Sequence, residues 1–575
     1  MLGQDYLTKA LLASKTLTNA ELKGLKDKLK AENLSLEEYL VKKHIVTEEV
    51  LYEMVAKHLN LPYIDLRNVT IRKDILLAVP EPIAQAHEVI AFDRDESTVK
   101  VATTDPDDLQ TFEFLGKSFQ AKLLIYLTSP SSFREASKQY HQSLKAEFAK
   151  LTGIDETKDE SSEGALHQLA EDLPVIRIVD TLLEYAIFER ASDIHIEPTE
   201  TQVVVRYRVD GILKDVMTLP KNVQPGLIAR IKILSNLKLD EHRLPQDGRF
   251  KVKTKEYEVS FRVSIIPVFD GEKIVMRLLQ ESGQVLTLEQ LGLQKKPLEV
   301  LKRNIDKPHG MILVTGPTGS GKTTTLYSIM NVLNTPDVNI STVEDPIEYR
   351  MPRINQSQVN PRIGFTFAGG LRALLRQDPD IIMVGEIRDS ETAEIGIHAA
   401  MTGHLVLSTL HTNDAVGTLP RLLDMGVAPF LVASTTNLIV AQRLVRKVCQ
   451  NCIASYQLSA KNVEDLAKQL DLPALLKTLT REGAITANQS MANLLFYRGK
   501  GCKQCSQEGY RGRIGIYEIF EITPTVAEMI LNRATANELK KAALSQGMLS
   551  MLEDGFLKAK NGITTVEEVL RVTKD

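Results

Sequence analysis

A glycine-rich segment that directly follows an apolar strand constrains this chain more than any other feature. Met311 to Val314 predict a buried strand, and the sequence Gly-Pro-Thr-Gly-Ser-Gly-Lys-Thr follows at 316–323. Its glycines allow backbone N–H groups to converge on phosphate oxygens, and the helix expected after it adds positive potential at its N-terminus. This is the Walker A pattern in the strand–loop–helix context that the pattern requires. A chance glycine-rich turn is the alternative, and the preceding strand argues against it.

The loop predicts a site for ATP and Mg2+. Lys322 would reach the β and γ phosphates, and Thr323 would offer its hydroxyl to the metal ion. The predicted nucleotide-binding residues are Gly316, Pro317, Thr318, Gly319, Ser320, Gly321, Lys322, Thr323 and Thr324.

Acidic residues follow two more apolar stretches. Ile381–Val384 predicts a buried strand that leads to Glu386, in the place where a Walker B strand delivers a carboxylate beside the phosphates. A shorter stretch, Ser341–Val343, leads to Glu344, which could orient water or hold magnesium. Taken alone, each acid more often caps a loop than takes part in catalysis.

Arginines and histidines supply two further sets of candidates. Apolar and polar residues alternate over 203–209, so a strand there would hold Arg208 on its polar face, and a second alternating stretch holds Arg262. His404 and His411 stand at the two ends of another apolar stretch. Arginines on such a face can simply pair with surface acids, and a lone histidine at a strand end is usually structural.

The four cysteines form two Cys-x-x-Cys pairs, Cys449 with Cys452 and Cys502 with Cys505. Four thiolates in this pattern suit tetrahedral coordination of Zn2+, and the long separation between the pairs can be closed as a loop. With four protein ligands no coordination position is left for a substrate, so we expect a structural zinc site. Redox pairs and four unligated thiols are the alternatives, and so few cysteines argue against a secreted disulfide framework.

The length of 575 residues predicts several domains. The segment 153–164 has almost no apolar residues, so it cannot contribute to a core and is the best candidate for a linker. A second hinge is predicted at 281–284, and capping-box patterns at 525–528 and 564–567 predict helices near the C-terminus. The predicted division is an N-terminal α+β interaction module at 1–145, an acidic flexible linker at 146–168, a second N-terminal α/β domain at 169–280, an interdomain linker at 281–300, and an ATPase domain at 301–575 that includes a tetracysteine element at 449–505.

Charge and hydropathy exclude several classes of protein. The formal net charge is -4, so no overall field would attract the chain to DNA or to an anionic membrane, and no basic stripe interleaved with aromatic residues is present. The longest apolar stretches fall far short of the roughly 20 residues that span a bilayer, and the N-terminus lacks a signal-peptide pattern. We therefore expect a cytoplasmic protein without direct nucleic-acid contact.

The motifs together resemble a known family, the secretion ATPase superfamily. The resemblance is closest to the assembly ATPases of type IV pili and the ATPases of type II secretion, and it extends at least from Leu169 to the C-terminus. Four segments in the same order resemble the nucleotide-site boxes of that family: 316–323, 343–348, 384–389 and 402–413. Three others resemble its second N-terminal domain: 191–198, 206–211 and 244–249.

This resemblance implies a multidomain α/β fold, with a C-terminal RecA-like P-loop ATPase domain after an α/β, PAS-like domain. It implies a homo-hexameric ring with ATP bound between these two domains, a zinc-binding tetracysteine element, and arginines from the second N-terminal domain on the phosphates. A guanidinium suits that role because its planar fork spreads charge over phosphoryl oxygens. Which glutamate activates water stays open. Carried over by position, the catalytic residues are Lys322, Glu344, Glu386, Arg208, Arg262, His404 and His411.

The function that the resemblance implies is an ATP-hydrolysing motor for type IV pilus assembly. It would work at the inner face of the cytoplasmic membrane, attached indirectly through an inner-membrane platform protein and other components of the machinery. Type II secretion and DNA-uptake pseudopilus motors are the alternatives within the family, and a nucleic-acid translocase or a nucleotide-gated scaffold with little turnover are alternatives from other classes. Some relatives bind cyclic di-GMP through Arg-Leu-Gly motifs, but here Met1-Leu2-Gly3 lacks the arginine, so we do not expect that ligand.

Overall fold

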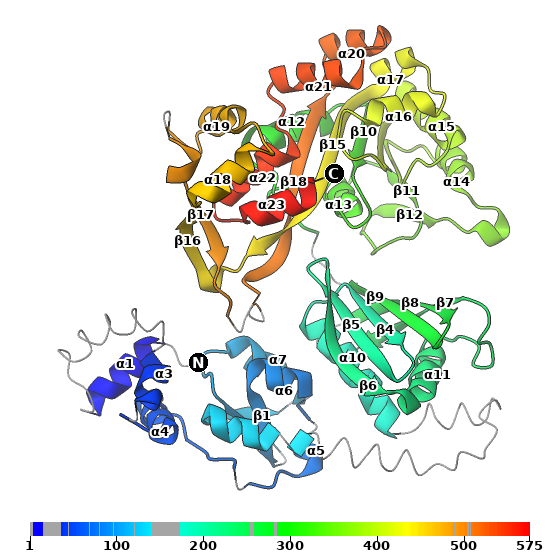
Figure 1. Ribbon diagram of the computed structural model, residues 1–575. Helices are drawn as coiled ribbons and strands as arrows, with labels where there is room; N and C mark the ends of the chain where they lie inside the picture. The colour runs from blue at the N-terminus through cyan, green and yellow to red at the C-terminus, as the bar shows by residue number, and fades with distance from the viewer. Residues whose placement is uncertain are drawn as a thin grey trace. The chain divides into compact units, whose positions relative to one another are not determined.

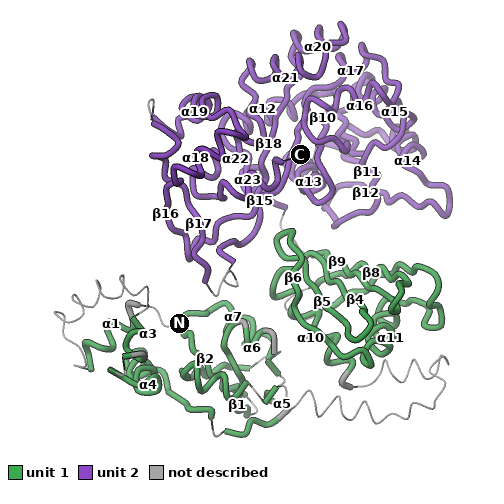
Figure 2. The backbone as a smooth tube through the Cα atoms, in the orientation of Figure 1, with its two compact units in different colours: residues 1–279 green, residues 280–575 purple. Residues whose placement is uncertain are grey.

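The computed structural model of the chain divides into two compact units, residues 1–279 and 280–575, which Figure 2 shows in different colours. The predicted acidic linker 146–168 lies outside the described residues. The structure describes residues 4–14, 36–43, 45–67, 69–76, 78–79, 81–95, 97–119, 121–137, 139–140, 173–253, 258–280, 285–486, 489–502, 505 and 508–574.

The N-terminal part of the first unit combines short helices with a three-stranded sheet (Figure 1). Helix α4 (Glu48–Leu59) begins at Thr47, whose hydroxyl accepts a hydrogen bond from the N–H of Val50, and it buries Leu51 and Val55. Strand β2 pairs antiparallel with β1 and parallel with β3. The other elements are α1 (Gln4–Ala13), α3 (Leu36–Lys42), α5 (Lys73–Leu76), α6 (Glu81–His87), β1 (Val89–Arg94), β2 (Thr98–Thr103), α7 (Leu109–Phe119) and β3 (Lys122–Leu127).

The second part of this unit is a six-stranded sheet in the order β6-β5-β4-β9-β8-β7. Strand β5 (Gln202–Val209) buries Val203, Val205 and Tyr207 in one hydrophobic core with residues of helices α10 and α11. The alternation therefore places Arg208 on the opposite face of the sheet. The remaining elements are α10 (Leu173–Phe188), β4 (Asp193–Pro198), β6 (Ile212–Pro220), η1 (Lys221–Val223), α11 (Gln224–Leu234), β7 (Gln246–Lys253), β8 (Glu258–Val268) and β9 (Gly271–Gln280).

A seven-stranded sheet in the order β12-β11-β13-β14-β10-β15-β18 forms the centre of the second unit. Strand β10 (Gly310–Thr315) is buried along its whole length and pairs in parallel with β14 and β15. Only β18, at the edge, runs antiparallel to its neighbour. The other strands are β11 (Ile340–Glu344), β12 (Ile354–Gln358), β13 (Ile381–Val384), β14 (Leu405–Leu410), β15 (Thr436–Val448) and β18 (Tyr510–Glu521).

Helices cover both faces of this sheet, which explains why its strands read as continuous apolar runs. Met311 and Leu313 of β10 belong to one hydrophobic core, and Ile312 and Val314 belong to a second core on the other face. The helices are α12 (Lys295–Ile305), α13 (Lys322–Leu333), α14 (Phe367–Leu374), α15 (Ser390–Met401), α16 (Thr418–Asp424), α17 (Pro429–Thr435), α20 (Pro524–Leu531) and α21 (Ala536–Ser545), with a short turn η2 (Pro361–Ile363).

A smaller subdomain of the second unit has a core of its own around Leu479, Phe496 and Phe556. It contains a two-stranded antiparallel ribbon and helices from two separate stretches of the chain. Its elements are η3 (Gln450–Cys452), β16 (Ile453–Gln457), α18 (Ala460–Ala467), α19 (Leu472–Arg481), η4 (Met491–Asn493), β17 (Leu495–Gly499), α22 (Met551–Lys560) and α23 (Val566–Thr573).

The predicted interdomain linker and two predicted helix caps differ from the structure. Within the predicted interdomain linker 281–300, Leu288, Leu291 and Leu293 are buried in the core of the second unit, because apolar side chains in this stretch pack against the sheet. The predicted caps at 525–528 and 564–567 are displaced, since Thr523 caps α20 and Thr565 caps α23.

Candidate nucleotide site

The glycine-rich loop connects the carboxyl end of β10 to the first residue of α13, Lys322. Gly316, Gly319 and Gly321 have backbone φ angles of 145°, 79° and 89°, which residues other than glycine rarely adopt. At Gly316 a Cβ atom would also lie 2.4 Å from the carbonyl oxygen of Gln442. The glycines are therefore required by the backbone path that the loop takes.

Lys322 lies over this loop. Its Nζ donates hydrogen bonds to the carbonyl oxygens of Gly316 at 2.9 Å and Pro317 at 3.2 Å. Burial lowers the pKa of the Lys322 ammonium, and the charge of Glu386 acts in the opposite direction. The structure thus brings the predicted phosphate-binding lysine and the predicted Walker B carboxylate together.

Glu386 follows β13 and faces Arg388 and His411. Its Oε1 pairs with Arg388 at 2.5 Å, and its Oε2 lies 3.2 Å from Nε2 of His411. Burial alone would raise the pKa of Glu386, but these two partners outweigh burial and lower it. Glu386 is therefore held as a carboxylate beside Lys322.

Glu344, the last residue of β11, has a different environment. Its side chain is buried and accepts hydrogen bonds from the hydroxyls of Tyr327 and Thr342, the latter at 2.6 Å, and from Nε2 of Gln356 at 3.1 Å. Burial raises the pKa of Glu344, and the three donors offset only part of that effect. A carboxylate whose pKa is raised is a better proton acceptor near neutral pH than one whose pKa is lowered.

Three threonines that the sequence analysis did not single out hold the strand ends in place. The hydroxyl of Thr409 donates to the carbonyl of Gly385 at 2.7 Å, next to Glu386. Thr315, at the end of β10, accepts a hydrogen bond from the N–H of Thr412 at 2.9 Å, next to His411. A polar residue at the end of an otherwise apolar strand is the only sequence signal for them.

His404 does not lie with these residues. It precedes β14, whereas His411 follows it, and β14 runs parallel to β10. The six residues between them span roughly 20 Å at 3.3 Å per residue. The ring Nδ1 of His404 lies 2.9 Å from the carbonyl of Ala399, at the end of α15. Within one chain, the structure therefore does not bring His404 together with Glu386 and His411, and its role in the nucleotide site stays a prediction.

The predicted arginines belong to the first unit. Arg208 lies 3.4 Å from the carboxylate of Asp193, which also pairs with Arg277 at 3.0 Å. Arg262 stands directly opposite Arg249 in the pairing of β7 with β8, a like-charge pair that is unfavourable without an anion. Arg277 and Arg249 were missed, although alternation along their strands places them on the same face as Arg208 and Arg262.

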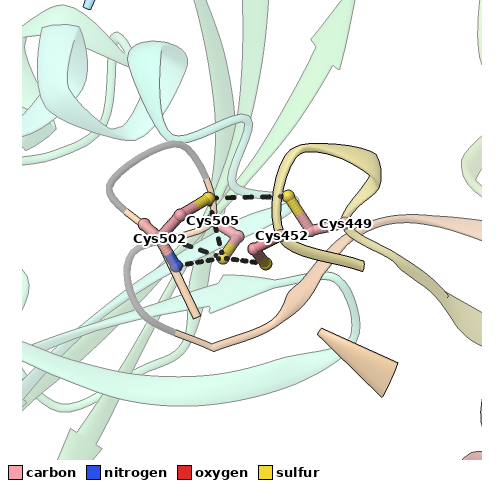
Figure 3. Close-up of side chains that lie close together, drawn as sticks. All are labelled: Cys449, Cys452, Cys502 and Cys505. Carbon is pink, nitrogen blue, oxygen red and sulfur yellow. Dashed lines mark hydrogen bonds between the residues drawn. The ribbon is translucent and has the colours of Figure 1, made fainter. Parts of the chain in front are cut away.

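The four cysteines come together at one end of the β15–β18 pair (Figure 3). The Sγ–Sγ distances are 3.8 Å for Cys449–Cys502, 3.8 Å for Cys452–Cys505 and 3.6 Å for Cys502–Cys505. Zn–S bonds of about 2.3 Å in a tetrahedron place sulfurs roughly 3.8 Å apart, whereas a disulfide requires about 2 Å. All four are free thiols, and the N–H groups of Cys502 and Gly509 point to Sγ of Cys505 at 3.2 Å. The donor set fits a metal ion with four sulfur ligands.

The fold and the phosphate loop together define a P-loop ATPase with a RecA-like domain. A family model described as type II/IV secretion system protein matches residues 168–571, more than half of the chain, and a model of the MshEN domain matches residues 59–147. The chain therefore belongs to the type II/IV secretion system protein family and is an ATPase of that family.

Curated relatives extend the similarity to nearly the whole chain. The type IV pilus assembly ATPase PilB of Myxococcus xanthus is 40% identical over 571 residues, 98% of both chains. The type II secretion system protein E of Xanthomonas campestris pv. campestris is 38% identical over 580 residues, 100% of this chain and 99% of the relative. Among solved structures, the ATPase DotB of Yersinia pseudotuberculosis has the same fold, with a TM-score of 0.51 and 24% identity over 69% of this chain and 93% of DotB. Among the described residues, no helix has the length and apolar character needed to cross a membrane.

Proposed function

We propose that this chain is the ATP-hydrolysing motor of a type IV pilus assembly machine. The observation that carries the proposal is the similarity to a type IV pilus assembly ATPase over 98% of both chains, together with a complete phosphate loop. A shared domain alone would support only the reaction, because the same ATPase domain serves different machines. Here the similarity also includes the N-terminal part, so it extends beyond the shared ATPase domain.

In this proposal the phosphate loop and the first turn of α13 bind the phosphates of ATP. Backbone N–H groups of the loop and Nζ of Lys322 would bind the β and γ phosphates, and the hydroxyl of Thr323 would hold Mg2+, which would neutralise charge on the phosphate oxygens. Arg208 and Arg262 of the sheet in the first unit would add positive charge to the phosphoryl group in a hexameric ring, with Arg249 and Arg277 on the same sheet face.

The two glutamates would divide the remaining work. Glu344, whose pKa is raised by burial, would accept a proton from the attacking water. Glu386, whose pKa is lowered by Arg388 and His411, would stay ionised and help to hold the hydrated Mg2+ beside Lys322. Environments that move two carboxyl pKa values apart are a common basis for such a division.

We further propose that Cys449, Cys452, Cys502 and Cys505 bind one Zn2+, which links the end of β15 to the segment before β18. The Sγ–Sγ distances of 3.6 and 3.8 Å support this, because four sulfurs around one tetrahedral Zn2+ lie roughly 3.8 Å apart. Metal analysis should give one zinc per chain in the wild type and much less in Cys452→Ser. Equal, near-zero zinc in both proteins would reject the assignment.

The motor would act at the inner face of the cytoplasmic membrane through an inner-membrane platform protein. A type II secretion motor is the second candidate, because a type II secretion system protein E is 38% identical over the whole chain. Deletion of the gene and complementation with the wild type should decide between them. Loss and recovery of surface pili supports pilus assembly, whereas loss and recovery of secreted proteins with normal pili supports the second candidate.

The reaction itself is tested with purified protein. Wild type should hydrolyse ATP in the presence of Mg2+, and Lys322→Ala should lose this activity while its oligomer mass is unchanged. A wild-type hexamer without turnover would contradict autonomous hydrolysis and favour a scaffold or a motor that needs its platform partner.

A further inference from the structure

Gln442, in the middle of β15, contacts the phosphate loop from the side opposite to the expected nucleotide. Strand β15 pairs with β10 as far as Thr315 opposite Ala441, so Gln442 lies beside the first residue of the loop, Gly316. Its side chain is only 1% exposed. A buried amide must have partners for both its ends, so the contacts of Gln442 define what it does.

Both ends of the amide are used. Nε2 of Gln442 donates to the carbonyl oxygen of Ser320 at 2.6 Å, and Oε1 accepts from the hydroxyl of Thr325 at 2.7 Å. The carbonyl of Ser320 can only accept, so the NH2 group must face it, and this fixes the orientation of the amide. Gln442 therefore connects the loop to the third residue after the start of α13.

The contact to Ser320 also determines where the next N–H points. The peptide between Ser320 and Gly321 is planar and trans, so its C=O and N–H point in opposite directions. With the C=O directed to Gln442, the N–H of Gly321 is directed to the other side of the loop. In the described part of the chain no group accepts a hydrogen bond from it, as expected for a donor that serves a phosphate oxygen.

We propose that Gln442 is a positioning residue for nucleotide binding, which holds the Ser320–Gly321 peptide so that the N–H of Gly321 faces the phosphates of ATP. Gln442 does not touch the nucleotide and acts only through the loop. Thr325 supports it by holding the amide in the orientation that presents NH2 to Ser320.

The substitution Gln442→Glu tests the proposal because it keeps the shape of the side chain and removes the donor. Two acceptors would then face each other at Ser320, and the peptide would turn away from the orientation that binds phosphate. Since phosphates are bound in both the ground state and the transition state, the loss should appear in KM. We expect the KM for Mg-ATP and the Kd for Mg-ADP to rise about tenfold or more, with kcat changed less than about threefold. Gln469→Glu makes the same chemical change at an exposed position of the same unit and should leave both constants unchanged.

The Kd for Mg-ADP separates this proposal from the proposed function, because it needs no turnover. An unchanged KM and Kd in folded Gln442→Glu of wild-type oligomer mass would overturn the positioning role. If Gln442→Glu does not fold, Thr325→Val decides, because it removes the hydroxyl that orients the amide and leaves the donor to Ser320 in place. A KM raised about threefold supports the proposal, and an unchanged KM rejects it.

Discussion

Two neighbouring strands of the central sheet, β11 and β13, end in the same way in the sequence and in different ways in the structure. Each short strand leads to a glutamate, Glu344 as the last residue of β11 and Glu386 two residues after β13. At the end of β11, Tyr327 of α13 covers Glu344, whose side chain is buried among three hydrogen-bond donors. At the end of β13, Glu386 faces Arg388 and His411.

The difference shows that the elements around a strand end determine the chemistry of the acid that it carries. For both carboxyl groups burial is the largest single influence, and by itself it would raise the pKa of each. For Glu386, the hydrogen bonds and charge of Arg388, together with His411, reverse the effect of burial, whereas the hydrogen bonds to Glu344 do not. The following predictions test whether this contrast corresponds to two different functions.

The largest effect is expected for Glu344→Gln. If Glu344 accepts the proton of the attacking water, its loss should lower kcat about 100-fold or more, because general base catalysis contributes factors of this size. The Kd for Mg-ATP, measured by calorimetry, should change little. A kcat within a factor of three of wild type would show that the buried glutamate is structural.

Glu386→Gln should instead change the dependence on magnesium. A carboxylate that orients the ligands of a metal ion typically contributes about 10- to 100-fold to metal affinity. We expect the Mg2+ concentration at half-maximal ATPase rate to rise about tenfold, with part of the rate recovered at high Mg2+. Loss of rate at every Mg2+ concentration, with unchanged half-saturation, would assign the catalytic base to Glu386 and reverse the proposed division.

Tyr327→Phe sharpens the contrast by removing one donor to Glu344. The buried carboxylate loses a partner, so the free energy of unfolding should fall by about 1–3 kcal/mol. Because the hydrogen bond from Tyr327 lowers the pKa of Glu344, its removal should raise that pKa. The acid limb of kcat against pH should therefore move to higher pH, and an unchanged limb would separate Glu344 from the rate-determining proton transfer.

Much of the site could be predicted because it depends on short segments. Fewer than ten consecutive residues contain the phosphate loop, each strand that leads to Glu344 or Glu386, and each Cys-x-x-Cys pair. Contacts between distant parts of the chain could not be predicted from the sequence. Tyr327 donates a hydrogen bond to Glu344, 17 positions away, and Gln442 donates one to Ser320 of the loop, 122 positions away. The separation of His404 from His411 could have been predicted from the sequence, because the two ends of one strand cannot meet.

The fold was predicted less well at its boundaries than in its class. The RecA-like arrangement was expected from the resemblance of the motifs to the secretion ATPase superfamily, whereas the periodic patterns predict individual strands and helices. The cap of α20 was misplaced by two residues because Thr525 satisfies the capping-box pattern, whereas the actual cap, Thr523, has Val526 at the third position after it. The cap of α23 was misplaced by one residue because Thr564 and Thr565 each have a glutamate three positions later. The stretch 288–293 falls within the linker predicted after the hinge at 281–284, but its leucines are buried in the core of the second unit.

The smallest expected effect concerns stability as a function of pH. The contributions of Glu344 and Glu386 to the free energy of unfolding should change in opposite directions as the pH falls. Glu386 has a folded pKa below its ordinary value of 4.5, so its contribution to stability is present above that pH and is lost as the pH falls through the folded pKa. Glu344 has a raised folded pKa, so its contribution is fully present below 4.5 and is lost as the pH rises through the folded pKa.

Urea unfolding of wild type, Glu344→Gln and Glu386→Gln from pH 7 to pH 4 measures these contributions as differences, in which effects common to all three proteins cancel. The destabilisation caused by Glu344→Gln should grow as the pH is lowered from 7, whereas that caused by Glu386→Gln should stay constant and then shrink below about pH 4.5. Parallel curves for the two variants would mean that the two strand ends, although built differently, hold their carboxylates with the same proton affinity.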